Sequence, residues 1–243
     1  MKTPNAQYNL AEPDSLALRA TAHMRRKMFD RFVAELQPST TDTVLDVGAT
    51  SDQTYASSNY LEAWYPHKAR IAATGIDDAS HLERAYPGVK FVPGNGKELP
   101  FGDAAFDFVH SSAVIEHVGS RSDQLRFIAE LWRVARRGIF LTTPNRWFPI
   151  EVHTSIPLLH WLPAASYRAL LRKMGLEFFA DEKNLNLLTG GDLSALCGQA
   201  GIGTVRVGSV SLLAWPSNLI LVATKQAAQG TGTRTPMPAE EPR

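Results

Sequence analysis

Apolar and polar positions change in blocks along the chain that predict strands and helices in turn. Residues 43–47 form a short run that is rich in β-branched residues and apolar on both faces, as in a buried parallel strand. The same criteria predict further strands over 70–76, 89–92, 106–110 and 138–142, and helices over 60–65, 81–86 and 123–135. This alternation predicts right-handed crossovers and a mostly parallel α/β sheet with helices on both faces.

The C-terminal third departs from this alternation. A helix is predicted over 192–200 and two strands over 205–213 and 218–223, with only Trp215-Pro216 near the connection. Two strands joined by so short a segment must pair antiparallel. The sheet is therefore expected to close with an antiparallel hairpin.

The two ends of the chain differ in composition from the middle. Residues 1–13 contain Pro4 and Pro13 and read as an N-terminal arm, followed by an amphipathic helix that ends near Leu36. Residues 227–243 are rich in Gly, Thr, Pro and Glu without periodicity, which predicts a disordered tail. One domain over residues 14–226 is the expectation.

Composition narrows the class of protein. The chain has 243 residues, of which 44% are hydrophobic, and this suits one large domain with a full core. A formal net charge of +1 provides no overall positive electrostatic field that would attract nucleic acid. Cys197 is the only cysteine, and the first residues lack the apolar run of a signal peptide, so a reducing, cytoplasmic setting is expected.

The first predicted strand ends in Asp46-Val47-Gly48, where a ligand site is expected. Ligands of parallel sheets bind beyond the carboxyl ends of the strands, and a glycine there exposes bare backbone. On these three residues alone, an ordinary strand end and turn explains the pattern equally well.

Four motifs in order strengthen the ligand-site interpretation. They are Val44-Leu45-Asp46-Val47-Gly48, Thr74-Gly75-Ile76-Asp77, the stretch from Glu98 to Val109, and Val114-Ile115-Glu116-His117-Val118. Over about residues 43–144 the chain resembles the class I S-adenosylmethionine-dependent methyltransferases, particularly the ubiquinone and menaquinone methyltransferase branch. The resemblance implies a Rossmann-like sheet of seven strands whose last two form an antiparallel hairpin, and S-adenosyl-L-methionine as cofactor.

The resemblance also implies roles at the cofactor. Asp77 is expected to accept hydrogen bonds from both ribose hydroxyls, with Asp78 as the alternative if the register slips by one residue. The other implied cofactor residues are Asp46 and Gly48 at the methionine end, Asn95 and Gly96 at the adenine, and Ser111 and Ser112 at the edge of the site.

Thr50 departs from the family pattern, which usually places glycine there. A β-branched residue resists positive φ, so either Thr50 keeps a negative φ and offers its hydroxyl to the cofactor, or the site is altered.

His117 is the candidate general base, because an imidazole titrates near neutrality. The competing interpretation is a histidine at a helix start whose ring binds backbone. Some quinone-pathway relatives hold a divalent metal with a similar Glu-His pair and an acid one turn earlier. That position is Ala113 in this chain, so no metal is predicted.

Residues 145–190 are predicted to form an insertion over the cofactor mouth. Arg146, Trp147 and His153 are the candidate substrate residues, and the segment reads as a lid, a wall for a small hydrophobic or amphipathic acceptor, a peripheral membrane contact, or ordinary packing. Prolines interrupt it too often for a membrane span. Nucleic acid is not expected as a partner, and the sequence carries no signal for an oligomeric state. A non-catalytic member of the fold is the alternative function.

Overall fold

The computed structural model describes residues 16–53, 55 and 57–225, with the side chains of residues 16–18 left aside. The predicted N-terminal arm and C-terminal tail lie outside these residues. Within them, the single sheet contains seven strands in the order β3-β2-β1-β4-β5-β7-β6. The strands are β1 (Val44–Val47), β2 (Ile71–Gly75), β3 (Lys90–Pro93), β4 (Phe106–Ser112), β5 (Ala135–Pro144), β6 (Val205–Leu212) and β7 (Trp215–Thr224).

The pairing confirms the predicted fold class. The strands from β3 to β5 pair parallel, while β7 is antiparallel to both β5 and β6. β7 begins at Trp215, three residues before the predicted start. It accommodates Pro216, which lacks an N–H, next to a register shift at Val210/Ser211 of β6.

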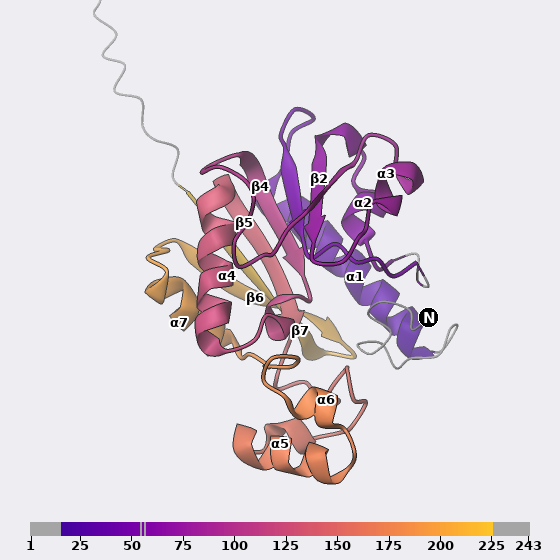
Figure 1. Ribbon diagram of the computed structural model, residues 1–243, viewed down its shortest axis with the longest axis vertical. Coiled ribbons are helices and arrows are strands. Elements are labelled where there is room, and N and C mark those ends of the chain that lie inside the picture. Colours follow the sequence, from indigo (N-terminus) through magenta and orange to yellow (C-terminus); the bar gives the residue numbers. More distant parts are fainter. Residues whose placement is uncertain (1–15, 54, 56, 226–243) are drawn as a thin grey trace, which may run out of the picture.

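Helices cover both faces of the sheet (Figure 1). They are α1 (Leu16–Leu36), α2 (Tyr60–Trp64) and α3 (His81–Ala85) on one face, and α4 (Arg121–Val134) and α7 (Gly190–Gln199) on the other. α4 begins with a capping box in which Ser120 and Asp123 exchange hydrogen bonds. It passes directly into β5, so that strand begins three residues earlier than the sequence pattern predicted.

Alternation along the strands divides the core into two layers. Val44 and Phe108 pack with α1, whereas Leu45 and Val109 pack with α4 and α7. All four residues of β1 are buried, as expected for a strand covered on both faces. This central strand therefore presents its carboxyl end, and the turn after it, in a fixed position.

The insertion between β5 and α7 forms a small unit of its own. It contains α5 (Ala164–Lys173) and α6 (Glu177–Ala180) and lies beyond the carboxyl end of β5 (Figure 1). Its apolar cluster consists of Tyr167, Leu171, Phe179, Ala180 and Leu185. Its location agrees with a cover over the site, although its role as a lid stays a prediction. No helix in the described part of the chain is long and apolar enough to cross a membrane.

Candidate active site

The turn after β1 requires glycine for a reason internal to the chain. Gly48 has a φ of +101°, and its N–H donates a hydrogen bond of 2.8 Å to the carbonyl of Thr74 in β2. A Cβ added here would lie 2.1 Å from Cγ2 of Val114. Both the backbone angle and the neighbour exclude a side chain at this position.

Thr50 keeps a backbone angle that a β-branched residue tolerates, and the contact of its hydroxyl with the cofactor stays a prediction. Its φ is not positive, and its N–H donates to Oδ1 of Asn59 at 2.9 Å while its carbonyl accepts from Nδ2 of the same residue at 3.0 Å. The hydroxyl accepts the N–H of Asp52 at 3.1 Å. The loop is thus fixed by a paired asparagine in place of the family's glycine.

Asp46 lies in a buried polar network under this turn. It pairs in register with His110 of β4, and Oδ1 lies 2.5 Å from Nδ1 of that ring. The other ring nitrogen of His110 lies 2.9 Å from the hydroxyl of Tyr60. Burial raises the pKa of Asp46 to about 7 and lowers the pKa of His110 to about 4, so both groups tend to their neutral forms. The carboxylate therefore has a partner within the chain, and its predicted contact with the methionine end remains a prediction.

Glu62 of α2 is a second carboxylate beside this network. The residue is fully buried, and neither carboxylate oxygen has a hydrogen-bond partner among the described residues. Burial, and then the charge of Asp46, raise the pKa of Glu62 well above its ordinary value. Its protonated form is therefore more favoured than that of an exposed glutamate.

The two acids after β2 have different surroundings. β2 ends at Gly75, and a Cβ there would lie 2.4 Å from the carbonyl oxygen of Ala49, so this strand end abuts the turn after β1. Asp77 is half-buried, whereas Asp78 is exposed and accepts the N–H of Ser80 at 2.9 Å. Asp77 is therefore the more buried of the two acids, and its ribose role stays a prediction.

Asn95 and Gly96 follow β3 at the same edge of the sheet. Oδ1 of Asn95 accepts the N–H of Lys97 at 3.0 Å. A Cβ on Gly96 would lie 2.3 Å from a ring carbon of Phe127, so this glycine is required by packing onto α4. The adenine role of both residues stays a prediction.

Ser111 and Ser112 lie inside β4 and not after it. Ser111 is buried and donates to the carbonyl of Val47 at 2.8 Å, while the hydroxyl of Ser112 lies 2.9 Å from that of Thr142 in β5. Their hydroxyls tie adjacent strands together at the end where the site is expected. Contact with a cofactor remains a prediction for both.

His117 ends a short 3₁₀ helix, η3 (Ile115–His117). Nδ1 lies 2.7 Å from the backbone carbonyl of Asn184, which can only accept, so Nδ1 carries the proton. Burial, and then the positive charge of His153, lower the pKa of His117 to about 3. The ring is neutral at physiological pH but a weak base, which limits the catalytic role predicted for it.

His153, a predicted substrate residue, is buried inside the insertion. Its Nδ1 lies 2.6 Å from Oε1 of Glu151, and its ring centroid lies 4.7 Å from that of His117. Burial alone would lower the pKa of His153, but the hydrogen bond and charge of Glu151 outweigh it and raise the pKa. No pattern in the sequence indicates that His117 and His153 are neighbours.

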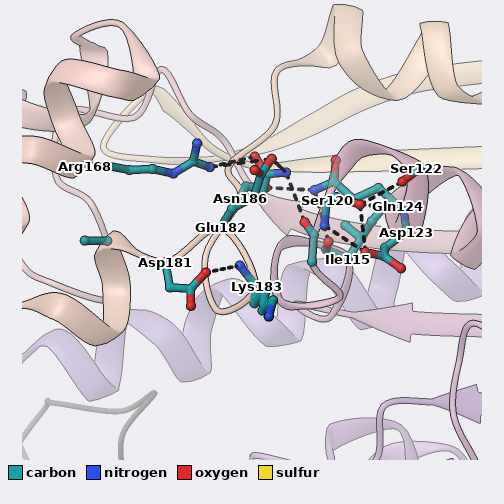
Figure 2. A network of polar contacts seen from close by, with 12 residues as sticks. Ile115, Ser120, Ser122, Asp123, Gln124, Arg168, Asp181, Glu182, Lys183 and Asn186 are labelled. Atoms are coloured by element: carbon teal, nitrogen blue, oxygen red, sulfur yellow. Dashed lines mark hydrogen bonds and ion pairs between the residues drawn. The ribbon is translucent and has the colours of Figure 1, made fainter.

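A polar network joins the insertion to η3 and to the start of α4 (Figure 2). The N–H of Asn186 donates to the carbonyl of Glu116 at 2.7 Å, and Nε2 of Gln124 donates to the carbonyls of both Asn186 and Ile115. Arg168 of α5 reaches Oδ1 of Asn186 at 3.5 Å. These contacts hold the segment that supplies the carbonyl of Asn184 to His117.

Of the remaining predicted substrate residues, Arg146 is half-buried and Trp147 is exposed. Arg146 donates to the carbonyl of Leu162 at 3.0 Å, and its guanidinium lies 5.8 Å from the ring centroid of Trp147. Trp147 is 50% exposed and meets Trp161 edge to face, and Trp161 in turn stacks on Trp215 of β7. Three tryptophans thus form an exposed aromatic surface between the insertion and the hairpin.

Arg25 of α1 lies against the loop after β1. It donates to the hydroxyl of Ser57 at 3.0 Å, and burial lowers its pKa despite the charges of Tyr60 and Asp52. Arg26 and Lys27, its neighbours in sequence, are exposed, whereas Arg25 is half-buried. A loop that packs back over the helix, which the sequence pattern does not reveal, covers Arg25.

Comparison with known proteins identifies the family. Residues 45–142 match the family described as methyltransferase domain. A probable S-adenosylmethionine-dependent methyltransferase of Mycobacterium tuberculosis is 37% identical over 81 residues, which are 32% of this chain and 28% of that protein. The matched stretch thus covers under a third of the length of the curated relative.

Solved structures agree on the fold over most of the chain. A S-adenosylmethionine-dependent methyltransferase from Aquifex aeolicus has a TM-score of 0.55 at 15% identity and covers 88% of this chain and 99% of its own. Magnesium protoporphyrin IX methyltransferase from Synechocystis, solved with S-adenosylhomocysteine, has a TM-score of 0.53 at 18% identity over 90% of this chain and 91% of its own. Residues 45–142 thus match a methyltransferase domain, and the chain shares the fold of solved S-adenosylmethionine-dependent methyltransferases, in agreement with the ordered motifs.

Proposed function

We propose that this protein transfers a methyl group from S-adenosylmethionine to a small hydrophobic or amphipathic acceptor. The observation that carries the proposal is the edge where β1 and β2 end: the glycine-only turn at Gly48 hydrogen-bonds to Thr74 of β2, and the half-buried Asp77 follows the end of that strand by two residues. A ribose diol needs an acidic acceptor at the carboxyl end of a strand, and Asp77 provides one at this edge.

Each candidate residue has a separate task in this reaction. When bound, the cofactor supplies a methyl group on a positively charged sulfur. Asp77 would accept from the ribose hydroxyls, Asn95 would accept from the adenine amino group, and Arg25 would attract the cofactor carboxylate. Positioning of the acceptor beside the methyl group accounts for much of the acceleration expected here. His117 would act as base only for an acceptor that must lose a proton, and its low pKa makes it a weak one.

The acceptor class is inferred from the insertion. Trp147, Trp161 and Trp215 provide exposed aromatic area that would desolvate an apolar molecule, and Arg146 beside them would orient a polar handle. Nucleic acid draws much of its affinity from phosphate neutralisation, and a net charge of +1 does not favour it.

A non-catalytic, ligand-binding role is favoured by one observation. The N–H groups of Gly48, Ala49 and Thr50 all donate within the chain, so the altered turn offers none of these three to a cofactor. A methyltransferase turns over an acceptor, whereas a non-catalytic protein only binds its ligand. Measurement of acceptor turnover therefore separates the two functions.

We expect release of S-adenosylhomocysteine from a panel of quinol precursors, lipid-linked sugars and small phenols. Trp147→Ala should raise KM for the active acceptor, because it removes half-exposed aromatic area, and should leave cofactor affinity unchanged. Trp132 of α4, which is partly buried and lies outside the insertion, provides a tryptophan control as Trp132→Ala. Calorimetric binding of S-adenosylmethionine without turnover of any acceptor would support the non-catalytic role. Turnover confined to oligonucleotides or peptides would contradict the acceptor class.

Asp77→Ala should weaken S-adenosylhomocysteine binding by about 2–3 kcal/mol, because two hydrogen bonds to a charged group are lost. Asp78→Ala is the matched control and should have less effect, since this carboxylate is exposed and already accepts from Ser80. Isothermal calorimetry on both variants gives the comparison, with urea unfolding to show that the fold is retained. A larger loss for Asp78→Ala would reverse the ribose assignment.

A further inference from the structure

Three side chains with metal-binding atoms meet where η3 faces the insertion. One ligand atom from each of Glu116, His117 and His153 lies within 4.8 Å of the other two. Nε2 of His117 is 3.9 Å from Oε1 of Glu116. Two imidazoles and one carboxylate form a donor set that suits zinc and related divalent transition metals.

Both histidines are oriented by a partner at Nδ1. His117 donates to the carbonyl of Asn184, and Nδ1 of His153 lies 2.6 Å from a carboxylate oxygen of Glu151. These partners place the proton on Nδ1 and leave Nε2 as the unprotonated nitrogen of each neutral ring. Histidines that bind metals are typically held in this way, by a carboxylate or carbonyl at the other nitrogen.

Glu116 is the independent observation that points to a ligand. The residue is 0% exposed, and Oε2 accepts a hydrogen bond of 2.9 Å from the hydroxyl of Thr143. Oε1, the oxygen that faces His117, has no hydrogen-bond partner among the described residues. A buried carboxylate oxygen without a partner is costly, and a bound cation would satisfy it.

The local charge also favours a dication. Glu116 and Glu151 are both buried, and Oε1 of Glu151 lies 2.6 Å from Nδ1 of His153. A divalent ion would balance two buried carboxylates while both imidazoles stay neutral.

We propose that Glu116, His117 and His153 bind one divalent transition-metal ion of the zinc class. Three ligands at tetrahedral positions around zinc lie about 3.3 Å apart, so the 3.9 Å gap between Glu116 and His117 must contract by about half an ångström and other gaps, of at most 4.8 Å, by up to about 1.5 Å. Three protein ligands leave a fourth position for water or an oxygen atom of the acceptor. His117, whose side chain is 17% exposed, provides the open side.

Sequence reasoning missed this site because it considered only nearby positions. Ala113 occupies the place of an acid one turn earlier, but the third ligand comes from the insertion, far along the chain. The alternative arrangement without metal is a protonated His153 between Glu151 and Glu116. That arrangement also balances part of the charge, so the experiment must separate the two.

Full-length protein stripped with a chelator should bind about one Co²⁺ per chain, with the visible absorption of a tetrahedral ion, and Zn²⁺ should displace it. His153→Ala and Glu116→Gln should abolish this absorption. Glu151→Gln should weaken Co²⁺ binding by about 10–100-fold, because it removes the partner that orients His153. His81→Ala, a histidine at the start of α3 outside the cluster, is the matched control and should bind as the unaltered protein does.

Circular dichroism and S-adenosylhomocysteine binding of each variant distinguish loss of the metal from loss of the fold. Because the readout is metal content, failure of the methyltransferase proposal leaves this test intact. Absence of Co²⁺ and Zn²⁺ binding by the unaltered protein would overturn the site. Binding that persists in both ligand variants, or a doubly protonated His153 in nitrogen NMR of the metal-treated protein, would overturn it as well.

Discussion

Gly48→Ala is expected to destabilise the protein by about 2–5 kcal/mol, the sum of strain at a positive φ and of overpacking. The φ of +101° is one that side chains rarely adopt, and the new Cβ would lie 2.1 Å from Cγ2 of Val114. Because Gly48 also joins β1 to β2 through the carbonyl of Thr74, any relief by backbone movement would disturb the proposed cofactor site.

Urea unfolding of a double-mutant cycle separates the two causes. Val114→Ala removes the methyl groups that the new Cβ would meet, so the double variant should retain the strain of the φ angle and lose the steric part. Gly102→Ala is the matched control, since a Cβ there meets nothing within 4 Å. A Gly48→Ala variant as stable as the control would show that the turn adopts another path.

Glu62→Gln is expected to become more stable than the unaltered protein as pH rises. Burial, and then the charge of Asp46, hold the folded pKa of Glu62 well above that of the unfolded chain. The contribution of Glu62 to the free energy of unfolding is therefore largest below the pKa of the unfolded chain. Between the unfolded and the folded pKa, each pH unit removes about 1.4 kcal/mol of it. Glutamine has no proton to lose, so the variant avoids that loss.

Urea midpoints at pH 5 and pH 8 measure the difference directly. The stability of Glu62→Gln relative to the unaltered protein should rise over this interval. Glu98→Gln, an exposed acid, is the matched control and should show no such trend. Parallel profiles for the Glu62→Gln variant and the unaltered protein would mean that Glu62 is ionised throughout.

The sequence by itself determined the elements of this fold and their order. Two-residue alternation and buried apolar runs encode strands, and helical spacing encodes the face that packs on the sheet, so both are readable locally. The same local reading located Gly48 and Asp77 at strand ends, because parallel strands bring their carboxyl ends to one edge. For that reason the class of protein followed from four short motifs.

The tertiary structure alone decided which distant side chains share a buried volume. Glu62 beside Asp46, Arg25 under the loop at Ser57, and His153 beside His117 all join segments that no periodicity connects. Local pattern specifies which face of an element is buried but not which loop packs against it. Burial and nearby charges set the pKa of each of these groups. Their protonation states therefore depend on contacts that form only in the folded chain. The cluster proposed to bind a metal depends on such contacts as well.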